Sequence, residues 1–384
     1  MVEGPNSPKK LMRIAFFADD ARVYPEELTS LLEKLSADQH RVRCFAPEWP
    51  DHVAKLATAS GAETDTFPVE IDKNWVLMPQ RALRGQVASV VNGWTPDIIV
   101  AIGPTNALRI LPTVKPGHAK RVAILDRFVL DDTAPEIVEP GRIVTDADII
   151  QLAKSCDVIV CHTKQDEHAL AAALTRLAPK RKPVLSTAAG YGVNTTLLKQ
   201  RHLPSTSGEV TFLMTAPLDH WKGVMDYSAA ASLVTGRSTN AIFRLQGAAG
   251  RTPNAIRYED VLKPQRIDPV DTTVGMAQAI ANAHVLVVAS HHDGLPREML
   301  AALALGRPLI CANFAGSREA IDERINGVIY EKGNASALAN ACDSFLRRPD
   351  LIPAMGRASR QKAERKFSED AVLRSYLRII GVGA

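Results

Sequence analysis

The stretch that decides the fold runs from residue 290 to 310 and reads Ser290-His-His-Asp-Gly-Leu-Pro-Arg-Glu-Met-Leu-Ala-Ala-Leu-Ala-Leu-Gly-Arg-Pro-Leu-Ile310. An apolar run, Val285–Ala289, precedes it, and a second one, Pro308–Ala312, ends it. Between them we expect a polar turn at Asp293-Gly294 and a helix that begins at Pro296 and stops at Gly306. This order of strand, loop, helix and strand is typical of a doubly wound parallel sheet.

The loop in this unit follows the carboxyl end of a strand, where open α/β sheets bind their ligands. It presents a carboxylate, Asp293, and then the N-terminus of a helix, which favours an anion. The pattern therefore predicts a ligand that combines hydroxyl groups with a phosphate.

Composition and charge limit the class of protein. The chain has 384 residues, enough for two domains, with 46% hydrophobic and 23% charged residues and a net charge of +4. No apolar run approaches the ~20 residues of a membrane span, and the polar first ten residues do not resemble a signal peptide. The five scattered cysteines contain no C-x-x-C pair, which indicates reduced thiols and a cytoplasmic protein.

Buried strands alternate with helix-length segments through both halves of the chain. In the first half the expected strands are Met12–Ala18, His40–Ala46, Pro96–Ile102, Arg121–Asp126 and Cys156–His162, with helices at Pro25–Leu35 and Leu77–Val91. In the second half they are Val210–Thr215, Ala241–Gln246, Val285–Ala289 and Leu309–Ala312, with a helix at Gly223–Leu233 and terminal helices over Ala337–Ile380, interrupted at Arg348-Pro349. The polar, turn-rich segment 201–208 is the expected linker. Two doubly wound α/β domains follow from this order.

The opening segment resembles the nucleotide-sugar signature of the retaining glycosyltransferases of family 4, E-G-x-P-x-x-x-x-E-A-x-A-x-G-x-P. The matching residues are Gly294, Pro296, Ala302, Ala304, Gly306 and Pro308. The two glutamates are replaced, by Asp293 and Ala301. Three further segments resemble the family: Gly190-Tyr-Gly-Val-Asn194 its G-x-G-V-D turn, Lys222-Gly223-Val224 its K-G-V, and Phe367-Ser-Glu369 its terminal crossing segment.

This resemblance implies a GT-B fold, in which two Rossmann-like parallel-sheet domains face a cleft. Residues 1–200 would form the acceptor-side domain, 201–208 the linker, 209–368 the nucleotide-sugar domain, and 369–384 a helix that crosses back. It also implies a nucleoside diphosphate sugar as donor, a carbohydrate or lipid-linked acceptor, and no cofactor or metal.

The resemblance implies roles for two residues in catalysis. Lys222 would neutralise the donor diphosphate, although the arginine that the family carries five residues earlier is Pro217 here. Asp293 would hold hydroxyls of the donor sugar, with one methylene less than glutamate. Taken alone, Lys222 is a surface lysine and Asp293 the first residue of an Asp-Gly turn. We expect Lys222 at the edge of a loop, so that Lys222→Ala weakens nucleotide binding and leaves the fold intact.

The other donor-side candidates surround these two residues in the expected cleft. They are Gly223, Gly247, His292, Gly294, Leu295, Pro296 and Glu298. The family's ribose-binding glutamate is Ala301 here, so Glu298, three residues earlier on the same helix, could supply the carboxylate. A solvated glutamate in the first turn of a helix is the alternative interpretation. Gly247 follows a strand and is alternatively a plain turn residue.

Acceptor-side candidates are Gly103, Asp126 and Arg127, at the ends of two expected strands; Ile102 stands near where the family often has histidine. The basic residues Arg176, Lys180, Arg181 and Lys182 form either a solvated turn or a contact with anionic lipid at the inner face of the membrane. Aromatic residues make up 5% of the chain and no nucleic-acid motif occurs, so we expect no nucleic-acid partner.

Two hypotheses about function follow. The first is a retaining glycosyltransferase, and the second is a degenerate homologue that binds a nucleotide sugar or a partner transferase without turnover. The joint replacements Pro217, Ala301 and Ile102 favour the second hypothesis. A dinucleotide oxidoreductase is disfavoured because no G-x-G-x-x-G follows the first strand.

Overall fold

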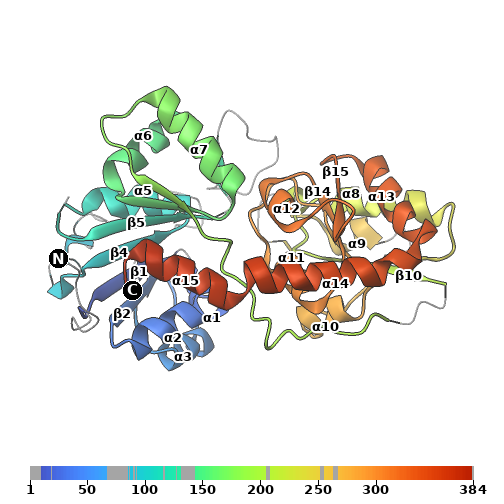
Figure 1. The fold of residues 1–384 in the computed structure, drawn as a ribbon, viewed down its shortest axis with the longest axis horizontal. Coiled ribbons are helices and arrows are strands. Elements are labelled where there is room, and N and C mark those ends of the chain that lie inside the picture. Colours follow the sequence, from blue (N-terminus) through green and yellow to red (C-terminus); the bar gives the residue numbers. More distant parts are fainter. Residues whose placement is uncertain are drawn as a thin grey trace, which may run out of the picture.

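The computed structural model describes residues 10–18, 20–66, 85, 87–89, 91, 93–115, 117–126, 128–130, 143–204, 208–250, 255–262 and 267–382. Two α/β domains lie side by side along its longest axis (Figure 1). Each is built around one parallel sheet, so the predicted pair of doubly wound domains is confirmed.

The first domain contains a seven-stranded sheet in the order β3-β2-β1-β4-β5-β8-β9, with every strand pair parallel. Its strands are β1 (Arg13–Phe17), β2 (Arg41–Ala46), β3 (Glu63–Thr66), β4 (Ile98–Ile102), β5 (Lys120–Leu125), β8 (Val158–Cys161) and β9 (Val184–Thr187). The short strands β6 (Val129–Leu130) and β7 (Ile143–Val144) pair separately. Its helices are α1 (Val23–Glu27), α2 (Thr29–Ala37), α3 (Asp51–Ala59), α5 (Pro104–Ile110), α6 (Asp146–Ser155) and α7 (Lys164–Leu177).

Alternating side chains of β1 build two cores, one on each face of this sheet. Ala15 and Phe17 pack with residues of α5, α6 and α7, whereas Ile14 and Phe16 pack with residues of α2 and α3. Successive side chains of a strand point to opposite faces, so a continuous apolar run requires cover on both sides.

The second domain contains a six-stranded sheet in the order β12-β11-β10-β13-β14-β15, and its strand pairs are also parallel. Its strands are β10 (Val210–Thr215), β11 (Ala241–Gln246), β12 (Ile267–Pro269), β13 (Val285–Val288), β14 (Leu309–Ala312) and β15 (Gly327–Tyr330). Its helices are α8 (Val224–Thr235), α9 (Tyr258–Leu262), α10 (Met276–Ala281), α11 (Arg297–Leu305), α12 (Ala315–Ala320), α13 (Ala335–Arg347) and α14 (Ile352–Lys362).

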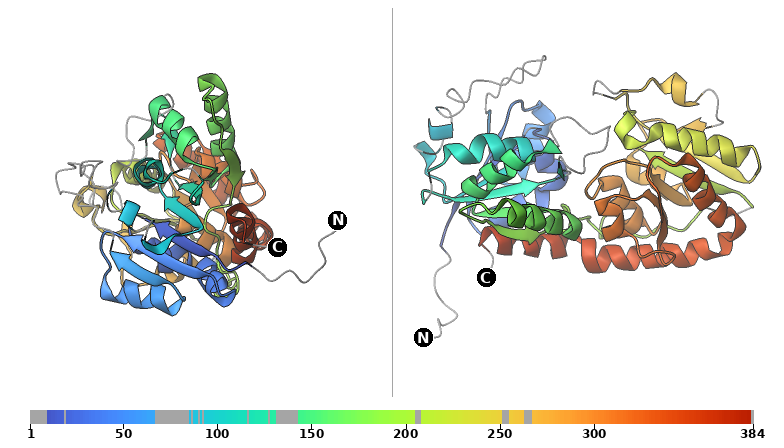
Figure 2. Two further views of the ribbon diagram at one scale, coloured as in Figure 1. Left: turned by 90° about the vertical axis from the view of Figure 1, so that its left-hand side faces the viewer. Right: turned by 90° about the horizontal axis from the view of Figure 1, so that it is seen from above.

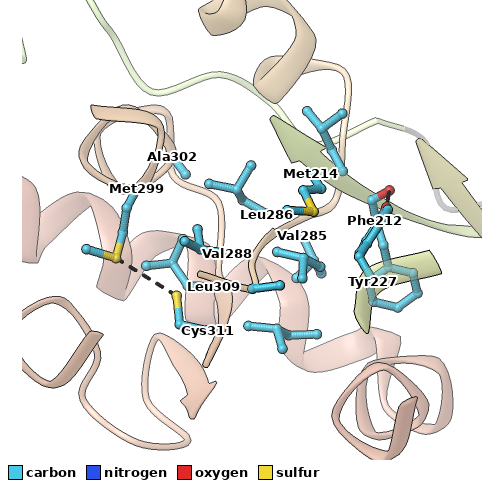
Figure 3. Close-up of a cluster of buried hydrophobic side chains, with 14 of the residues drawn as sticks. Phe212, Met214, Tyr227, Val285, Leu286, Val288, Met299, Ala302, Leu309 and Cys311 are labelled. Carbon is cyan, nitrogen blue, oxygen red and sulfur yellow. Dashed lines mark hydrogen bonds between the residues drawn. The ribbon is translucent and has the colours of Figure 1, made fainter. Parts of the chain in front are cut away.

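The core of the second domain fixes helix α11 against the sheet. Met299 of α11 points toward Cys311 of β14, and the two sulfur atoms lie 3.9 Å apart (Figure 3). Helix α11 ends where expected, because Gly306 adopts a left-handed conformation with φ of 74° at its C-cap. The helix therefore presents a fixed N-terminus to the loop that contains Asp293.

Two chain segments cross between the domains side by side. The Val193 amide donates to the Phe367 carbonyl at 2.8 Å, and the Glu369 amide donates to the Val193 carbonyl at 3.0 Å. After Phe367 the chain enters α15 (Glu369–Ile380), which packs on the first domain through Val372 and Tyr376. Helices α14 and α15 follow one another along one edge of both domains (Figure 2). A Cβ on Gly192 would lie 3.0 Å from the Glu369 Cα, so a glycine permits this close crossing.

The crossing lies earlier in the chain than the predicted linker 201–208. Ala188 belongs to a core of the first domain and Val193 to the core of the second. Leu198 and Leu203 pack against the core of the second domain. The Arg360 guanidinium donates to the carbonyls of Thr195 and Leu198.

Most sequence-predicted elements agree with the structure, with a few corrections. The predicted bounds of β10, β11 and β14 are confirmed, whereas the helix predicted over Pro25–Leu35 is two helices that meet at Leu28. The polar edge strand β3 was not expected. The predicted helix Leu77–Val91 lies mostly outside the described residues. All five cysteines are buried free thiols. Among the described residues, no helix combines the length and apolar character of a membrane span.

Candidate functional site

Two cavities meet at Lys222 and Glu298, in the space between the domains. The larger, of about 740 Å³, lies at the carboxyl ends of β10 and β11 and is lined there by Thr215, Gln246 and Gly247. The smaller, of about 240 Å³, is lined by both domains. The larger volume falls in the range of about 300–1,000 Å³ that is common for small-molecule sites.

A glycine turn brings Lys222 to the junction of these cavities. The chain leaves β10, forms a short 3-10 turn over His220–Lys222, and turns at Gly223, whose φ is 71°. A Cβ on Gly223 would lie 2.0 Å from the Ala289 carbonyl oxygen, at the end of β13. Only glycine allows this combination of backbone angle and contact. The turn thus places Lys222 beside the loop that follows β13.

Lys222 forms a buried ion pair with Asp293. Its ammonium donates to Asp293 Oδ2 at 2.5 Å, and Glu298 Oε1 lies 3.9 Å away. Lys222 is 5% exposed and Asp293 1%. The ammonium also lies 4.2 Å from the centre of the Trp221 ring, a cation–π contact. Lys222 lies in the loop after β10, as expected, but its burial contradicts the interpretation of it as a surface lysine.

Asp293 is surrounded by donors on both carboxylate oxygens. Besides Lys222, the Ser290 hydroxyl lies 3.3 Å from Oδ2 and the Gly294 amide donates to Oδ1 at 3.1 Å. Helix α12 packs directly against the loop after Asp293, since a Cβ on Gly316 would lie 1.4 Å from the Gly294 carbonyl oxygen. In this arrangement Asp293 fixes the position of Lys222, and its expected contact with sugar hydroxyls stays a prediction.

Glu298 and Ala301 differ sharply in their surroundings. Glu298, in the first turn of α11, lines both cavities and therefore lies at their junction. Ala301 is 2% exposed and belongs to the core of the second domain. Pro217, by contrast, is exposed and lines the larger cavity.

The remaining donor-side candidates are divided between the cavities. Leu295 and Pro296 line the smaller one, and Gly247 lines the larger one, where a Cβ would lie 2.3 Å from the Ala216 carbonyl oxygen. His292 is half-buried and lines neither cavity.

The acceptor-side candidates lie at the ends of two neighbouring strands. Gly103, with φ of 86°, caps α5 after β4, and it lines a cavity of about 450 Å³ together with Asp126, Ile102 and Pro217. Asp126 also lines the 240 Å³ cavity. Arg127 lies outside the described residues.

Several cavity residues were missed by sequence reasoning. From the first domain these are Arg22, Glu26, His162 and Tyr191, and from the second Trp221, Gln246 and Val274. His162 is buried, and its Nε2 lies 3.2 Å from the Tyr376 hydroxyl of α15. A position just after a strand was the available signal for Arg22 and His162.

Polar contacts join the domains on two sides of the cavities. Arg297 pairs with Glu26 at 2.5 Å. The backbone N–H of Lys164, at the start of α7, donates to Glu319 Oε1 of α12 at 2.7 Å. These contacts hold α1 and α7 of the first domain against α11 and α12 of the second.

Two members of the basic group at the end of α7 and in the loop after it have acidic partners. Arg176 forms a two-pronged ion pair with Asp146 at 2.7 Å, and Arg181 pairs with Asp157. Lys180 and Lys182 are exposed, in the loop that precedes β9. No group of three His, Cys, Asp or Glu side chains suited to a metal ion occurs within the described part of the chain.

Comparisons with known proteins agree with this arrangement. Residues 209–348 match the model of a family described as glycosyl transferases group 1. The second domain is therefore similar to the domains that this family model describes. The match covers the strands, turns and helices that surround Lys222, Asp293 and Glu298.

The curated relatives match only part of the chain. The capsular polysaccharide biosynthesis glycosyltransferase CapM of Staphylococcus aureus is 24% identical over 39% of this chain and 40% of CapM. The N,N'-diacetylbacillosaminyl-diphospho-undecaprenol alpha-1,3-N-acetylgalactosaminyltransferase of Campylobacter jejuni is 22% identical over 41% of each chain. The chain thus matches about two-fifths of the length of these relatives.

Solved structures match the whole fold. A glycosyltransferase from Rickettsia africae has a TM-score of 0.74 at 17% identity, with 96% of this chain and 98% of that chain covered. Anabaena Alr3699/HepE, in complex with UDP and glucose, has a TM-score of 0.72 at 15% identity, with 96% and 99% covered. The likeness extends over both domains, and the predicted GT-B fold is confirmed.

Proposed function

We propose that the protein is a retaining glycosyltransferase that moves a sugar from a nucleoside diphosphate sugar to a carbohydrate or lipid-linked acceptor. The observation that carries the proposal is the group Lys222, Asp293 and Glu298 at the junction of two cavities. One cavity is formed mainly by the second domain and the other by both domains. A transferase needs such a pair of adjoining sites, because two substrates must meet at one reacting carbon.

The larger cavity suits the nucleotide. Gln246 and Gly247 end β11, and Val274 with Met276 supplies an apolar wall for a base. At the junction, the Lys222 ammonium would offset charge on the diphosphate, and Asp293 keeps that ammonium in place. The proposed donor sugar would then extend past Leu295 and Pro296 into the smaller cavity.

The proposed reaction breaks the bond between the anomeric carbon and the diphosphate oxygen. A hydroxyl of the acceptor forms the new bond on the same face of the sugar, which gives retention, and its proton passes to the departing diphosphate. Lys222 and the N-terminus of α11 would stabilise the charge that develops on the leaving group. The domain contacts at Glu26–Arg297 and Glu319–Lys164 would help to exclude water.

For the acceptor, carboxylates in the smaller cavity favour a molecule rich in hydroxyl groups. Glu27, Asp126 and Glu369 line it, and carboxylates accept hydrogen bonds from hydroxyls. The printed names of the relatives from Staphylococcus and Campylobacter support a place in polysaccharide or glycoconjugate synthesis. We propose a cytoplasmic protein that contacts anionic lipid through Lys180 and Lys182.

One observation favours a second function, binding without turnover. The only lysine at the junction among the described lining residues is already paired with Asp293, and Glu298 adds a second carboxylate. The net charge of this group is negative, which opposes a diphosphate. In addition, Ala301 offers no polar group to a ribose.

Glu298→Ala distinguishes the two functions. If Glu298 binds the ribose, the nucleotide dissociation constant rises about tenfold, the ~1.5 kcal/mol of one charged hydrogen bond. The experiment titrates UDP, GDP and ADP by calorimetry and follows consumption of the matching sugar nucleotides. Glu323→Ala, an exposed glutamate elsewhere on the same domain, is the control and should leave nucleotide affinity unchanged. A silent Glu298→Ala together with no consumption of any sugar nucleotide would support the non-catalytic function.

A further inference from the structure

The first domain supplies a cation opposite the position where the second domain lacks one. Arg22 follows β1 and occupies the position just before the first residue of α1. It lines the 740 Å³ cavity together with Pro217 and Lys222. It also lines the adjoining 450 Å³ cavity, again together with Pro217. Arg22 and Pro217 therefore approach one space from opposite domains.

The charge around the larger cavity requires such a group if a diphosphate binds there. Among the described residues that line it, the cations are Arg22 and Lys222, and the acids are Asp20, Asp219 and Glu298. Lys222 is already paired with Asp293. A diphosphate placed beside Lys222 alone would meet an excess of negative charge, which Arg22, the other described cation of this lining, would reduce.

A neighbouring carboxylate orients the Arg22 guanidinium. Nε lies 2.9 Å from both oxygens of Asp20, and Nη2 also pairs with Oδ2. The backbone amide of Arg22 donates to the same carboxylate at 2.9 Å. Nη1 donates no hydrogen bond within the described part of the chain, and the side chain is 43% exposed. A guanidinium held along one edge presents its other N–H groups as a fork that suits phosphate oxygens.

We propose that Arg22 binds the diphosphate of the donor and takes the place of the arginine that Pro217 replaces. This rests on the proposed function. The diphosphate then bridges the domains, with Arg22 on one side and Lys222 on the other. A nucleoside monophosphate lacks the terminal phosphate and gains little from Arg22. The degenerate appearance of the second domain is therefore compensated by the first.

The test is calorimetric titration of the full chain with UDP, GDP and ADP and with the matching monophosphates. Arg22→Gln should raise the dissociation constant of the preferred diphosphate about 10- to 100-fold, as expected for one charge-assisted hydrogen bond. The monophosphate constant should change by less than about threefold, because ~0.6 kcal/mol or less is at stake. Arg348→Gln is the matched control, because Arg348 pairs with Asp350 two residues away in the same manner. It should leave both constants unchanged.

A second variant tests whether arginines at positions 22 and 217 would bind the same diphosphate. Adding Pro217→Arg to Arg22→Gln should recover at least about tenfold of the lost diphosphate affinity. No recovery, or equal losses for diphosphate and monophosphate, would overturn the assignment of Arg22. Unchanged diphosphate binding in Arg22→Gln would overturn the assignment of Arg22 and leave the proposed function standing. A wild-type protein that binds no diphosphate would overturn the proposed function as well.

Discussion

Replacing Lys222 by methionine should destabilise the fold, because it leaves the Asp293 carboxylate buried without its cation. Both side chains are nearly inaccessible, at 7% and 0% exposure. Removing one partner of a buried pair costs about 3–5 kcal/mol. For a domain of this size, 1 kcal/mol shifts the melting temperature by about 2–4 °C. The expected decrease in the melting temperature is therefore roughly 6–20 °C.

The assay is thermal unfolding followed by circular dichroism, on Lys222→Met, Asp293→Asn and the double variant. The double variant should lose less stability than the sum of the two single variants, because neither charge is then left alone. Lys34→Met is the control, since the Lys34–Asp38 pair joins the same two residue types at the end of α2, where the Lys34 side chain is 43% exposed. Such a pair contributes about 0.3–0.5 kcal/mol, so the control should melt close to the wild type.

A melting temperature of Lys222→Met within about 2 °C of the wild type would refute this reasoning. It would mean that Asp293 either becomes protonated at little cost or reaches water. Strictly additive losses in the double variant would also contradict a direct interaction between the two side chains.

Three further predictions concern the turn at Gly223, the acid Asp166 and metal ions. Gly223→Ala should lower the free energy of unfolding by about 2–5 kcal/mol, from backbone strain and overpacking together. The control Gly333→Ala has a similar φ of 74° and open space around it, so it should lower the free energy of unfolding by only about 1–2 kcal/mol. Equal losses in the two variants would exclude the contact with Ala289. Burial raises the pKa of Asp166 from 3.8 to about 6, so the folded state binds this proton more tightly than the unfolded state. In denaturant titrations, the stability of the wild type relative to Asp166→Asn should therefore fall by about 1–3 kcal/mol between about pH 4 and pH 6. A stability difference that does not change with pH would contradict the raised pKa. If sugar transfer is found, excess chelator should leave its rate nearly unchanged, because Lys222, Arg22 and the helix N-termini supply the positive charge; a strict requirement for magnesium or manganese would contradict this proposal.

The sequence was sufficient for those elements whose own residues determine them. Largely apolar runs predicted β10, β11 and β14, because strands covered on both faces carry few polar residues. The Pro296 and Gly306 boundaries of α11 follow from local backbone preferences. The edge strand β3, Glu63–Thr66, is polar and is stabilised by pairing with β2, so no local pattern could reveal it.

The site was less predictable because its contacts join distant parts of the chain. Lys222 and Asp293 are 71 residues apart, and a lysine in a polar turn gives no sign of burial. Arg22 meets Pro217 only once the two domains are placed side by side. The resemblance to a known motif located the loop and the lysine, whereas their pairing and the contribution of the first domain came only from the structure.

The paired crossing at Val193 and Phe367 makes the second domain an insertion within the first. The chain leaves and returns at hydrogen-bonded neighbours, the Val193 amide and the Phe367 carbonyl, 2.8 Å apart. A segment with adjacent ends can be exchanged as a cassette without stretching the host, as with other tolerated domain insertions. Under the proposed function, donor specificity would move with this segment when it is exchanged between relatives at these two points, while α15 stays with the first domain, whose core it completes.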